Sequence, residues 1–345
     1  MTSISNEASR ITRHRHCDVL VYVDIQAGIK RNQASRAIQY CMALLVFLFP
    51  VSEAAEKQIL SEYSALASKS LLLDITRVAN SVIAVGERGH VIKSDDCGKI
   101  WKQIIIPDRV TLNGIYFLDD KHGWIVGHDS TILKTVDGGE HWKLVYHDIA
   151  AEQPLFDILF VSASKGFAIG AYGAYLETRD GGSSWSKKSV FGEDDFHLYS
   201  ISRVGEDKLI ITGESGAIYV SSSNGEKWWR VKSPYEGTLF GNMVLSDGRV
   251  LIFGMRGNLY SSDDLGEKWQ RLKSGVDATL DAGIELDDKT VLLTGSAGTV
   301  LESVDGGASY NIIQQKLRSH RAALVQCTDG RVLSAGEKGI QQISR

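Results

Sequence analysis

The sequence predicts an all-β fold built as a ring of seven small antiparallel sheets. The phrase Gly-x-x-Gly, followed by a short apolar run, occurs seven times at intervals of 41 or 43 residues. A second phrase, Ser/Thr-x-Asp-x-Gly-x-x-Trp, follows six of these copies, with Ser223 and Tyr310 as departures from it. A repeat of this length forms one sheet that cannot bury both faces alone, so neighbouring sheets must stack. Radial stacking of such sheets gives a seven-bladed β-propeller. The first glycines of the copies are Gly86, Gly127, Gly170, Gly213, Gly254, Gly295 and Gly336.

Each repeat contains four short runs that we expect to form the antiparallel strands A to D of one blade. In the second repeat, residues 111–117 form strand A and residues 123–126 form strand B. The Gly-x-x-Gly turn then leads to strand C, such as residues 299–302 of the sixth repeat, and strand D begins at the Trp of the second phrase. Four such strands in sequence order are typical of a propeller blade.

Both phrases have structural roles. A tight turn between strands needs positive φ angles, which glycine adopts without strain, so the turn with Ser130 in place of the second Gly should be strained or differently shaped. In the second phrase, the hydroxyl and the carboxylate can accept backbone N–H groups of their own loop, while the Trp packs between sheets. Five carboxylates that are each tied to their own turn favour structure over catalysis, and Ser223 in place of the sixth Asp predicts a weaker fourth loop.

The two ends of the repeat region suggest how the ring closes. The seventh copy ends after its strand C and has no strand D. Residues 57–67 precede the first strand A and have no partner of their own. We therefore expect residues 57–67 to supply the missing outer strand of the last blade, with a helix over residues 56–70 as the alternative.

Residues 1–56 lie outside the repeat and form a separate segment from the propeller of residues 57–345. Residues 1–29 show no pattern, and we expect them to be disordered or not translated. Basic residues precede the apolar run 43–51, and Ser52-Glu53-Ala54 follows it, which predicts a signal peptide cleaved after Ala54. The run is shorter than the roughly 20 residues that span a bilayer. The alternatives are a buried strand and a start codon assigned upstream of the true signal. We therefore expect export to the periplasm, or membrane-anchored export.

The cysteine pattern leaves two thiols in the exported chain. Cys17 and Cys41 belong to the segment predicted to be removed, whereas Cys97 and Cys327 fall in the first and last repeats. Cys97 is placed in an outer loop and Cys327 at the end of an inner strand. A disulfide needs Cα atoms within about 7 Å, so we expect two free thiols, with a disulfide as the alternative. No Cys/His grouping has metal-site spacing, and we expect no metal and no cofactor.

Composition and charge argue against one class of partner. The chain is 43% apolar and 23% charged, as in ordinary globular proteins, with a net charge of −4. The repeat region contains no long basic run of the kind that binding to a nucleic-acid backbone requires. We therefore expect no nucleic-acid binding.

The phrase over residues 135–142, Thr-Val-Asp-Gly-Gly-Glu-His-Trp, resembles the Asp-box, or bacterial neuraminidase repeat. The longer phrase over residues 123–142 resembles the seven-bladed photosystem II stability and assembly factors of cyanobacteria and chloroplasts, and their relatives in non-photosynthetic bacteria. The resemblance covers residues 57–345. It implies a non-enzymatic scaffold in the thylakoid lumen or periplasm. In the photosynthetic members such a scaffold helps to assemble a membrane complex and carries an arginine-rich surface patch.

Blade topology predicts where a partner binds. Consecutive antiparallel strands place the B–C turns and the D–A loops on one face of the ring. Basic side chains there concentrate near blades seven and one, while acidic side chains at 148–152 and 193–195 lie near blades two to four. Such a charge distribution can orient a charged partner; the alternative is that these loops are polar only because they are exposed. We expect a monomer that binds a membrane-associated protein partner through Arg88, Arg256, Arg318, His320, Arg321 and Lys338.

Arg321 is the most distinctive of these residues, because the other six copies carry Leu at its position. A charge at that position must find a partner or water. We therefore expect Arg321 to contribute to partner capture with little effect on thermal stability.

Two other functions fit the repeat less well. Sialidase-like glycoside hydrolases share the Asp-box, and Tyr172 and Glu214 occupy turns of adjacent blades on the loop face. Paired acids for glycoside hydrolysis would stand about 5–10 Å apart. The chain lacks the Arg-Ile-Pro motif of sialidases, so we expect no catalytic residues. An accessory subunit of an envelope exporter is the third possibility.

Overall fold

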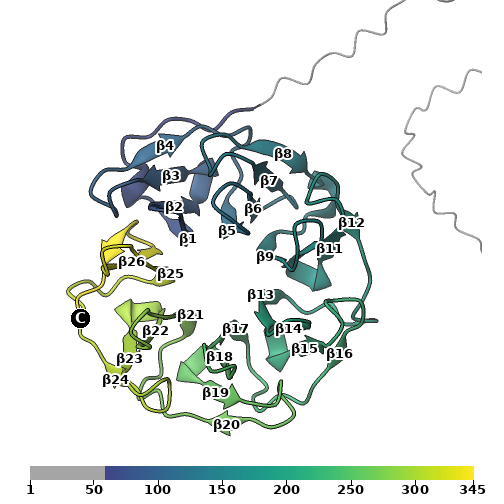
Figure 1. Ribbon diagram of the computed structural model, residues 1–345, viewed down its shortest axis with the longest axis vertical. Coiled ribbons are helices and arrows are strands. Elements are labelled where there is room, and N and C mark those ends of the chain that lie inside the picture. Colours follow the sequence, from purple (N-terminus) through teal and green to yellow (C-terminus); the bar gives the residue numbers. More distant parts are fainter. Residues whose placement is uncertain (1–58) are drawn as a thin grey trace, which may run out of the picture. The chain divides into compact units, whose positions relative to one another are not determined.

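The computed structural model describes residues 59–345, which form a ring of seven antiparallel sheets arranged as the blades of a propeller (Figure 1). The predicted extension and signal segment of residues 1–56 therefore lies outside the described residues. Blades 1 to 6 each contain four strands in sequence order, and blade 7 contains three. The all-β, seven-bladed architecture predicted from the repeat is confirmed. No helix among the described residues is long and apolar enough to cross a membrane.

The innermost and second strands form the core of the ring. Neighbouring innermost strands contact one another around its centre (Figure 1). The innermost strands A are β1 (Leu72–Val78), β5 (Leu112–Phe117), β9 (Leu155–Phe160), β13 (Leu198–Val204), β17 (Leu239–Val244), β21 (Leu280–Glu285) and β25 (Arg321–Gln326). The second strands B are β2 (Ser81–Gly86), β6 (Gly123–Gly127), β10 (Gly166–Gly170), β14 (Lys208–Gly213), β18 (Val250–Gly254), β22 (Val291–Gly295) and β26 (Val332–Gly336).

The third and outer strands are shorter. The third strands C are β3 (Val91–Ser94), β7 (Ile132–Thr135), β11 (Tyr175–Thr178), β15 (Ile218–Ser221), β19 (Leu259–Ser262), β23 (Val300–Ser303) and β27 (Gln341–Gln342). The outer strands D are β4 (Lys102–Ile104), β8 (Lys143–Tyr146), β12 (Ser186–Lys187), β16 (Trp229–Arg230), β20 (Gln270–Arg271) and β24 (Asn311–Ile312). Short 3₁₀ turns are η1 (Ala67–Lys69), η2 (Glu87–Gly89), η3 (Ile149–Ala151), η4 (Ala171–Gly173), η5 (Glu214–Gly216), η6 (Met255–Gly257) and η7 (Ser296–Gly298).

Burial explains why the second strands are almost entirely apolar. Every residue of β6, β10 and β18 is buried, because each second strand is covered by blades on both sides. Strands buried on both faces carry continuous apolar runs instead of alternating ones. The seven interfaces between blades together form the core of the protein.

The two glycines of the Gly-x-x-Gly turn are required for different reasons. Gly86 has an extended backbone with φ −175°, and a Cβ atom there would lie 2.1 Å from the carbonyl oxygen of Leu71. Gly86 therefore has to be glycine because its backbone lies too close to the start of the innermost strand for a side chain to fit. We expected a positive φ angle to be the reason, and at this first glycine that expectation was wrong. The second glycine does have positive φ, as at Gly89 with +70°. In blade 2, Ser130 adopts this conformation with φ +51°, and no 3₁₀ turn forms, so the altered turn is confirmed.

The Asp-box loops have the predicted structural role. Thr135 Oγ1 accepts the N–H of Gly139 at 3.1 Å, and Asp137 Oδ1 accepts the N–H of His141 at 3.0 Å. Trp142 donates its indole N–H to the carbonyl of Gly139 at 3.2 Å and is buried against the neighbouring blade. These bonds satisfy the loop backbone and place the indole between sheets.

The N-terminal segment does not close the ring as a strand. Ser61 donates its N–H to the carbonyl of Ile106 at 2.9 Å, and Ser64 donates its N–H to Gln103 Oε1 at 2.7 Å. Residues 60–64 therefore lie along the outer strand β4 of blade 1, and the sheet of blade 7 keeps three strands. The predicted closing strand was wrong, as was the long helix, because the backbone of this segment is satisfied at blade 1. Within residues 59–69, η1 is the part that contacts blade 7, where the carbonyl of Ser68 accepts the N–H of Ile340 at 3.0 Å.

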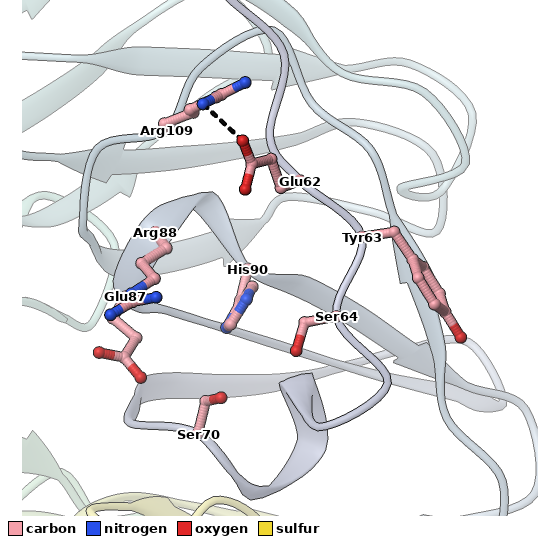
Figure 2. Close-up of a pocket in the computed structure, with 8 residues that line it drawn as sticks. All are labelled: Glu62, Tyr63, Ser64, Ser70, Glu87, Arg88, His90 and Arg109. Carbon is pink, nitrogen blue, oxygen red and sulfur yellow. Dashed lines mark ion pairs between the residues drawn. The ribbon is translucent and has the colours of Figure 1, made fainter.

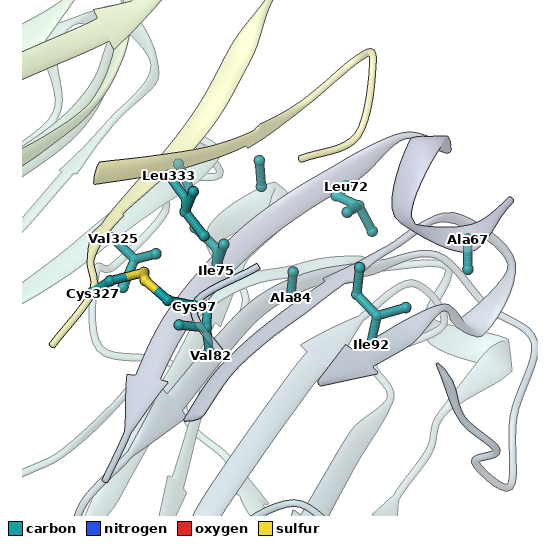
Figure 3. Close-up of a cluster of buried hydrophobic side chains, with 12 residues drawn as sticks. Ala67, Leu72, Ile75, Val82, Ala84, Ile92, Cys97, Val325, Cys327 and Leu333 are labelled. Carbon is teal, nitrogen blue, oxygen red and sulfur yellow. A yellow bond between two sulfur atoms is a disulfide. The ribbon is translucent and has the colours of Figure 1, made fainter. Parts of the chain in front are cut away.

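A disulfide joins blades 1 and 7 within a shared hydrophobic cluster (Figure 3). Cys97 and Cys327 have Cα atoms 5.8 Å apart and are bonded, so the expectation of two free thiols was wrong. Each Asp-box loop reaches over the blade before it, so a Cβ atom on Gly98 would lie 2.8 Å from Leu333 of blade 7. This reach brings the loop of Cys97 to the inner strand that ends before Cys327.

Candidate partner-binding face

The B–C turns and the D–A loops meet on one face of the ring, as predicted. In blades 1 to 3, backbone hydrogen bonds tie the turn to the loop that leaves the same blade. Gly89 donates its N–H to Val110 at 2.8 Å, and Gly173 donates its N–H to Phe196 at 2.9 Å. The Asp-box loops and the A–B turns are tied together in the same way elsewhere, as in the bond from Gly138 to Lys121 at 3.0 Å. We call the surface formed by the B–C turns and the D–A loops the loop face.

Arg88 lies over a hollow of about 450 Å³ on the loop face of blade 1 (Figure 2). The left-handed backbone of Arg88, with φ +56°, turns its exposed side chain away from the sheet. Beside it, Arg109 pairs with Glu62 at 2.8 Å. His90 at the base of the hollow is buried, its Nδ1 has no hydrogen-bond partner, and burial lowers its pKa. The hollow therefore presents the guanidinium of Arg88 and the Glu62-paired guanidinium of Arg109 near a neutral imidazole.

Arg256 lies apart from Arg88, on the B–C turn of blade 5. It is exposed and lines a second hollow of about 520 Å³ together with Arg271 and Lys273. Asp277 also lines this hollow. Sequence reasoning missed Arg271 and Lys273, although both lie just before the D–A loop that the topology places beside Arg256.

Three further predicted residues lie on blade 7 or in the loop that enters it. Arg318 is exposed, and Lys338 lies 3.7 Å from Glu337. His320 Nε2 lies 3.0 Å from Asp281 Oδ2, and this hydrogen bond raises the pKa of His320. One ring nitrogen of His320 is therefore already bonded to the neighbouring blade.

Arg321 is not part of the exposed face. It is only 3% exposed, and its guanidinium donates to the carbonyl of Leu317 at 3.4 Å and to Gln341 Oε1 at 3.1 Å. Burial lowers the pKa of Arg321, and its Nε has no partner. Arg321 therefore lacks the exposed position that a partner contact requires, because its guanidinium is held by backbone carbonyls and by Gln341, which the sequence pattern does not reveal.

Two carboxylates on the innermost strands have structural roles. Asp74 Oδ2 accepts the N–H of Ile115 from the next blade at 2.8 Å, and Asp157 Oδ2 accepts that of Ile201 at 2.8 Å. Burial is the main cause that raises the pKa of Asp74 to about 7 and that of Asp157 to about 6. Each carboxylate therefore links the innermost strands of two neighbouring blades.

Tyr172 and Glu214, the pair that suggested a hydrolase, both lie against His197. The ring centroids of Tyr172 and His197 are 4.6 Å apart, and Glu214 Oε2 lies 3.8 Å from His197 Nδ1. The imidazole therefore lies against both side chains. Sequence analysis did not single out His197 as a member of this group.

Comparison with known protein families shows to which family the chain belongs. A family model described as "Photosynthesis system II assembly factor YCF48" matches residues 97–153 and 145–276, more than half of the chain. The chain belongs to this family. The resemblance inferred from the repeat is confirmed.

Individual members of the YCF48 family give a similar result. The "Photosystem II assembly lipoprotein Ycf48" of Picosynechococcus is 39% identical over 140 residues, which is 40% of each chain. The chain thus aligns with about 40% of that relative's length. A solved structure described as "YCF48 bound to D1 peptide" superimposes with a TM-score of 0.66 and 20% identity, covering 80% of this chain and 94% of that one.

The same ring also occurs in enzymes. A GH74 xyloglucanase from Xanthomonas campestris superimposes with a TM-score of 0.64 and 12% identity, covering 79% of this chain and 52% of that one. Likeness at this level of identity shows a shared fold and no shared chemistry.

Proposed function

We propose that this protein is a non-enzymatic, exported assembly factor that holds an extracytoplasmic segment of a membrane protein on its loop face. Membership of the YCF48 family supports this proposal, as does a related structure whose description names a bound D1 peptide. The observation that carries it is the set of exposed guanidinium groups of Arg88, Arg256 and Arg318 on the loop face. Within residues 59–345, none of these three forms an ion pair.

The chemistry of these groups favours an acidic client segment. Guanidinium groups bind carboxylates through paired, charge-assisted hydrogen bonds. Exposed charges also accelerate encounter with a complementary partner, and salt screens this attraction. His320 and Lys338 would add positive charge around Arg318. We therefore infer that the client presents Asp or Glu side chains to the loop face.

Export is part of the same proposal. Several relatives carry the name lipoprotein, which supports a location outside the cytoplasm. The disulfide between Cys97 and Cys327 also favours an oxidising compartment. We infer a periplasmic location, or a thylakoid lumen in a photosynthetic host.

Replacing Arg88, Arg256 and Arg318 together with Ala tests the proposal. We expect the triple variant to lose most of its client in affinity capture followed by mass spectrometry, and the loss should shrink as salt is added to both samples. Unfolding free energy should change by no more than about 0.5 kcal/mol per site, as for exposed positions in general.

A matched control variant replaces Lys99, Lys227 and Lys268, which are exposed on the Asp-box loops, with Ala. It removes the same charge from the other set of loops and should capture the same client as the unmodified protein. Equal capture by the triple arginine variant and the unmodified protein would contradict the proposal.

A further inference from the structure

A row of aromatic side chains crosses the loop face at the centre of the ring. Phe156, Tyr199 and Phe240 each follow the first residue of the innermost strands β9, β13 and β17. The ring centroids of Phe156 and Tyr199 are 5.2 Å apart, and those of Tyr199 and Phe240 are 4.9 Å apart. All three side chains are half-buried, so each keeps part of its ring in water.

The row continues outward to a B–C turn. The centroid of His197 lies 6.2 Å from that of Tyr199 and 4.6 Å from that of Tyr172. Tyr172 is 57% exposed and has the left-handed backbone of its turn, with φ +53°. We call these five residues the aromatic strip: Phe156, Tyr172, His197, Tyr199 and Phe240.

The strip is specific to three blades. The corresponding positions of the other innermost strands carry Leu73, Asn113, Asp281 and Ala322, none of which is aromatic. The repeat therefore does not require aromatic residues at this position. A contiguous, partly exposed apolar surface on one side of a ring marks a contact site more often than isolated apolar residues do.

Acidic groups border the strip. Glu214 Oε2 lies 3.8 Å from His197 Nδ1, and it contributes, after burial, to the raised pKa of Tyr199. Glu193 and Asp195, in the loop that leads to His197, are exposed and form no ion pair within residues 59–345. Of the cations nearby, Arg230 is paired with Asp194 at 3.4 Å, whereas Lys188 at the start of this loop is exposed. The strip is thus apolar with a negatively charged border.

We propose that the aromatic strip binds an extended peptide segment that carries an aromatic or long aliphatic side chain next to Lys or Arg. The apolar side chain would pack on the rings, while the cation would interact with the π faces and with Glu214. This site is distinct from the exposed arginines, since it attracts the opposite charge. It stands whether or not those arginines bind a client.

A peptide fits the strip better than an oligosaccharide does. Sugar rings stack on open, flat aromatic faces, whereas the rings of Phe156 and Tyr199 cover each other with an interplanar angle of 21°. The exposed ring of Tyr172 is held edge-on to His197, at 89°. The available surface is therefore made of ring edges and partial faces, next to carboxylates.

Fluorescence anisotropy with two labelled peptides tests the proposal on the whole protein. The probes are acetyl-Lys-Phe-Lys-Phe-Lys-amide and acetyl-Glu-Phe-Glu-Phe-Glu-amide. The comparison uses the triple Arg88, Arg256 and Arg318 variant, because these arginines would themselves bind the glutamate peptide. In this variant we expect the lysine peptide to bind about tenfold more tightly than the glutamate peptide at low salt. Tyr172→Ala and Tyr199→Leu should each weaken binding of the lysine peptide by about three- to tenfold, and Glu214→Gln should narrow the difference between the two peptides.

The matched control is Tyr63→Ala, which removes a tyrosine that is 76% exposed beside blade 1. It should leave binding of both peptides unchanged. Tyr199→Leu keeps an apolar side chain in the strip, and thermal melting of each variant separates loss of the site from loss of the fold. Equal binding of the two peptides, insensitivity to the strip variants, or binding of cellotetraose in place of the lysine peptide would overturn the proposal. Loss of client capture in the triple arginine variant would neither support nor contradict binding at the aromatic strip, because that variant leaves the strip residues unchanged. The two proposals are therefore tested separately.

Discussion

At the scale of single residues, Asp74 shows how a carboxylate can serve a structural role in a ring. It accepts the backbone N–H of Ile75 at 2.7 Å and that of Ile115 in the next blade at 2.8 Å. These bonds lower the pKa of Asp74, but burial outweighs them and raises it to about 7. The folded protein therefore holds this proton at pH values where an unfolded chain has lost it.

The raised pKa predicts how stability depends on pH. Because the folded state binds the proton more tightly, the contribution of Asp74 is fully present below pH 4 and is lost as pH rises through about 7. We expect Asp74→Asn, which keeps an acceptor without a charge, to flatten the fall in melting temperature between pH 4.5 and 7.5. Thermal unfolding of both proteins at several pH values in this range measures how the melting temperature changes with pH. Asp305→Asn serves as a control, because hydrogen bonds lower the pKa of Asp305 and its effect should appear below pH 4. The raised pKa of Asp74 would be contradicted if the melting temperatures of the Asp74 variant and the unmodified protein differed by the same amount at every pH.

Arg321 shows that a charged residue at an apolar position need not face a partner. Its guanidinium is buried with three acceptors but leaves Nε unsatisfied. Replacing buried charged groups with apolar side chains of similar volume is often neutral or stabilising. We expect Arg321→Leu, which restores the residue of the other six copies, to leave the unfolding free energy unchanged or to raise it by about 1–2 kcal/mol. Denaturant unfolding measures this change. Loss of client capture in a stably folded Arg321→Leu protein would restore Arg321 to the partner-binding residues.

At the scale of elements, the Asp-box loops connect neighbouring blades. A Cβ atom on Gly139 would meet Ile83 of blade 1 at 2.5 Å, and one on Gly182 would meet Trp124 of blade 2 at 2.3 Å. Each loop thus packs on the blade before it, and glycine is needed where the backbone approaches that blade. In blade 1 the same reach places Cys97 beside Cys327 of blade 7.

The disulfide should contribute strongly to stability because it spans 230 residues. In the chain-entropy account, a crosslink closing a loop of this length lowers the entropy of the unfolded chain by the equivalent of about 5 kcal/mol. We expect the double variant Cys97→Ser with Cys327→Ser to lose several kcal/mol of unfolding free energy while keeping the ring. Denaturant unfolding and circular dichroism measure both properties, and reduction of the unmodified protein with dithiothreitol should reproduce the loss. An unchanged unfolding midpoint in the double variant would show that blade packing alone closes the ring.

At the scale of the whole molecule, the ring closes by packing and a crosslink in place of a shared sheet. Blade 7 contributes Ala323, Val325 and Leu333 to the cluster that also contains Leu72 and Ile92 of blade 1 (Figure 3). Ala67 of η1 fills the same cluster. A closed ring fixes the positions of seven turns and their loops on a rigid frame, so the loop face can vary in chemistry without altering the fold. The arginines and the aromatic strip are both additions of this kind.

The sequence by itself determined the number of blades, the order of strands and the identity of the loop face. These follow from local signals that each copy carries: turn glycines, Asp-box residues and apolar strands, each acting within about 40 residues. It also determined which arginines can lie on the loop face, because topology assigns every turn to one side. Arg88, Arg256 and Arg318 lie there as expected.

Tertiary structure alone decided the pairing of Cys97 with Cys327, the path of residues 60–64 along blade 1 and the burial of Arg321. It also decided that aromatic residues 41 to 43 positions apart in sequence touch across three blades. All of these depend on how far a loop or side chain reaches into the neighbouring blade. Packing between repeats sets the distance over which a loop or side chain extends into the next blade. The pattern within one repeat does not contain this information.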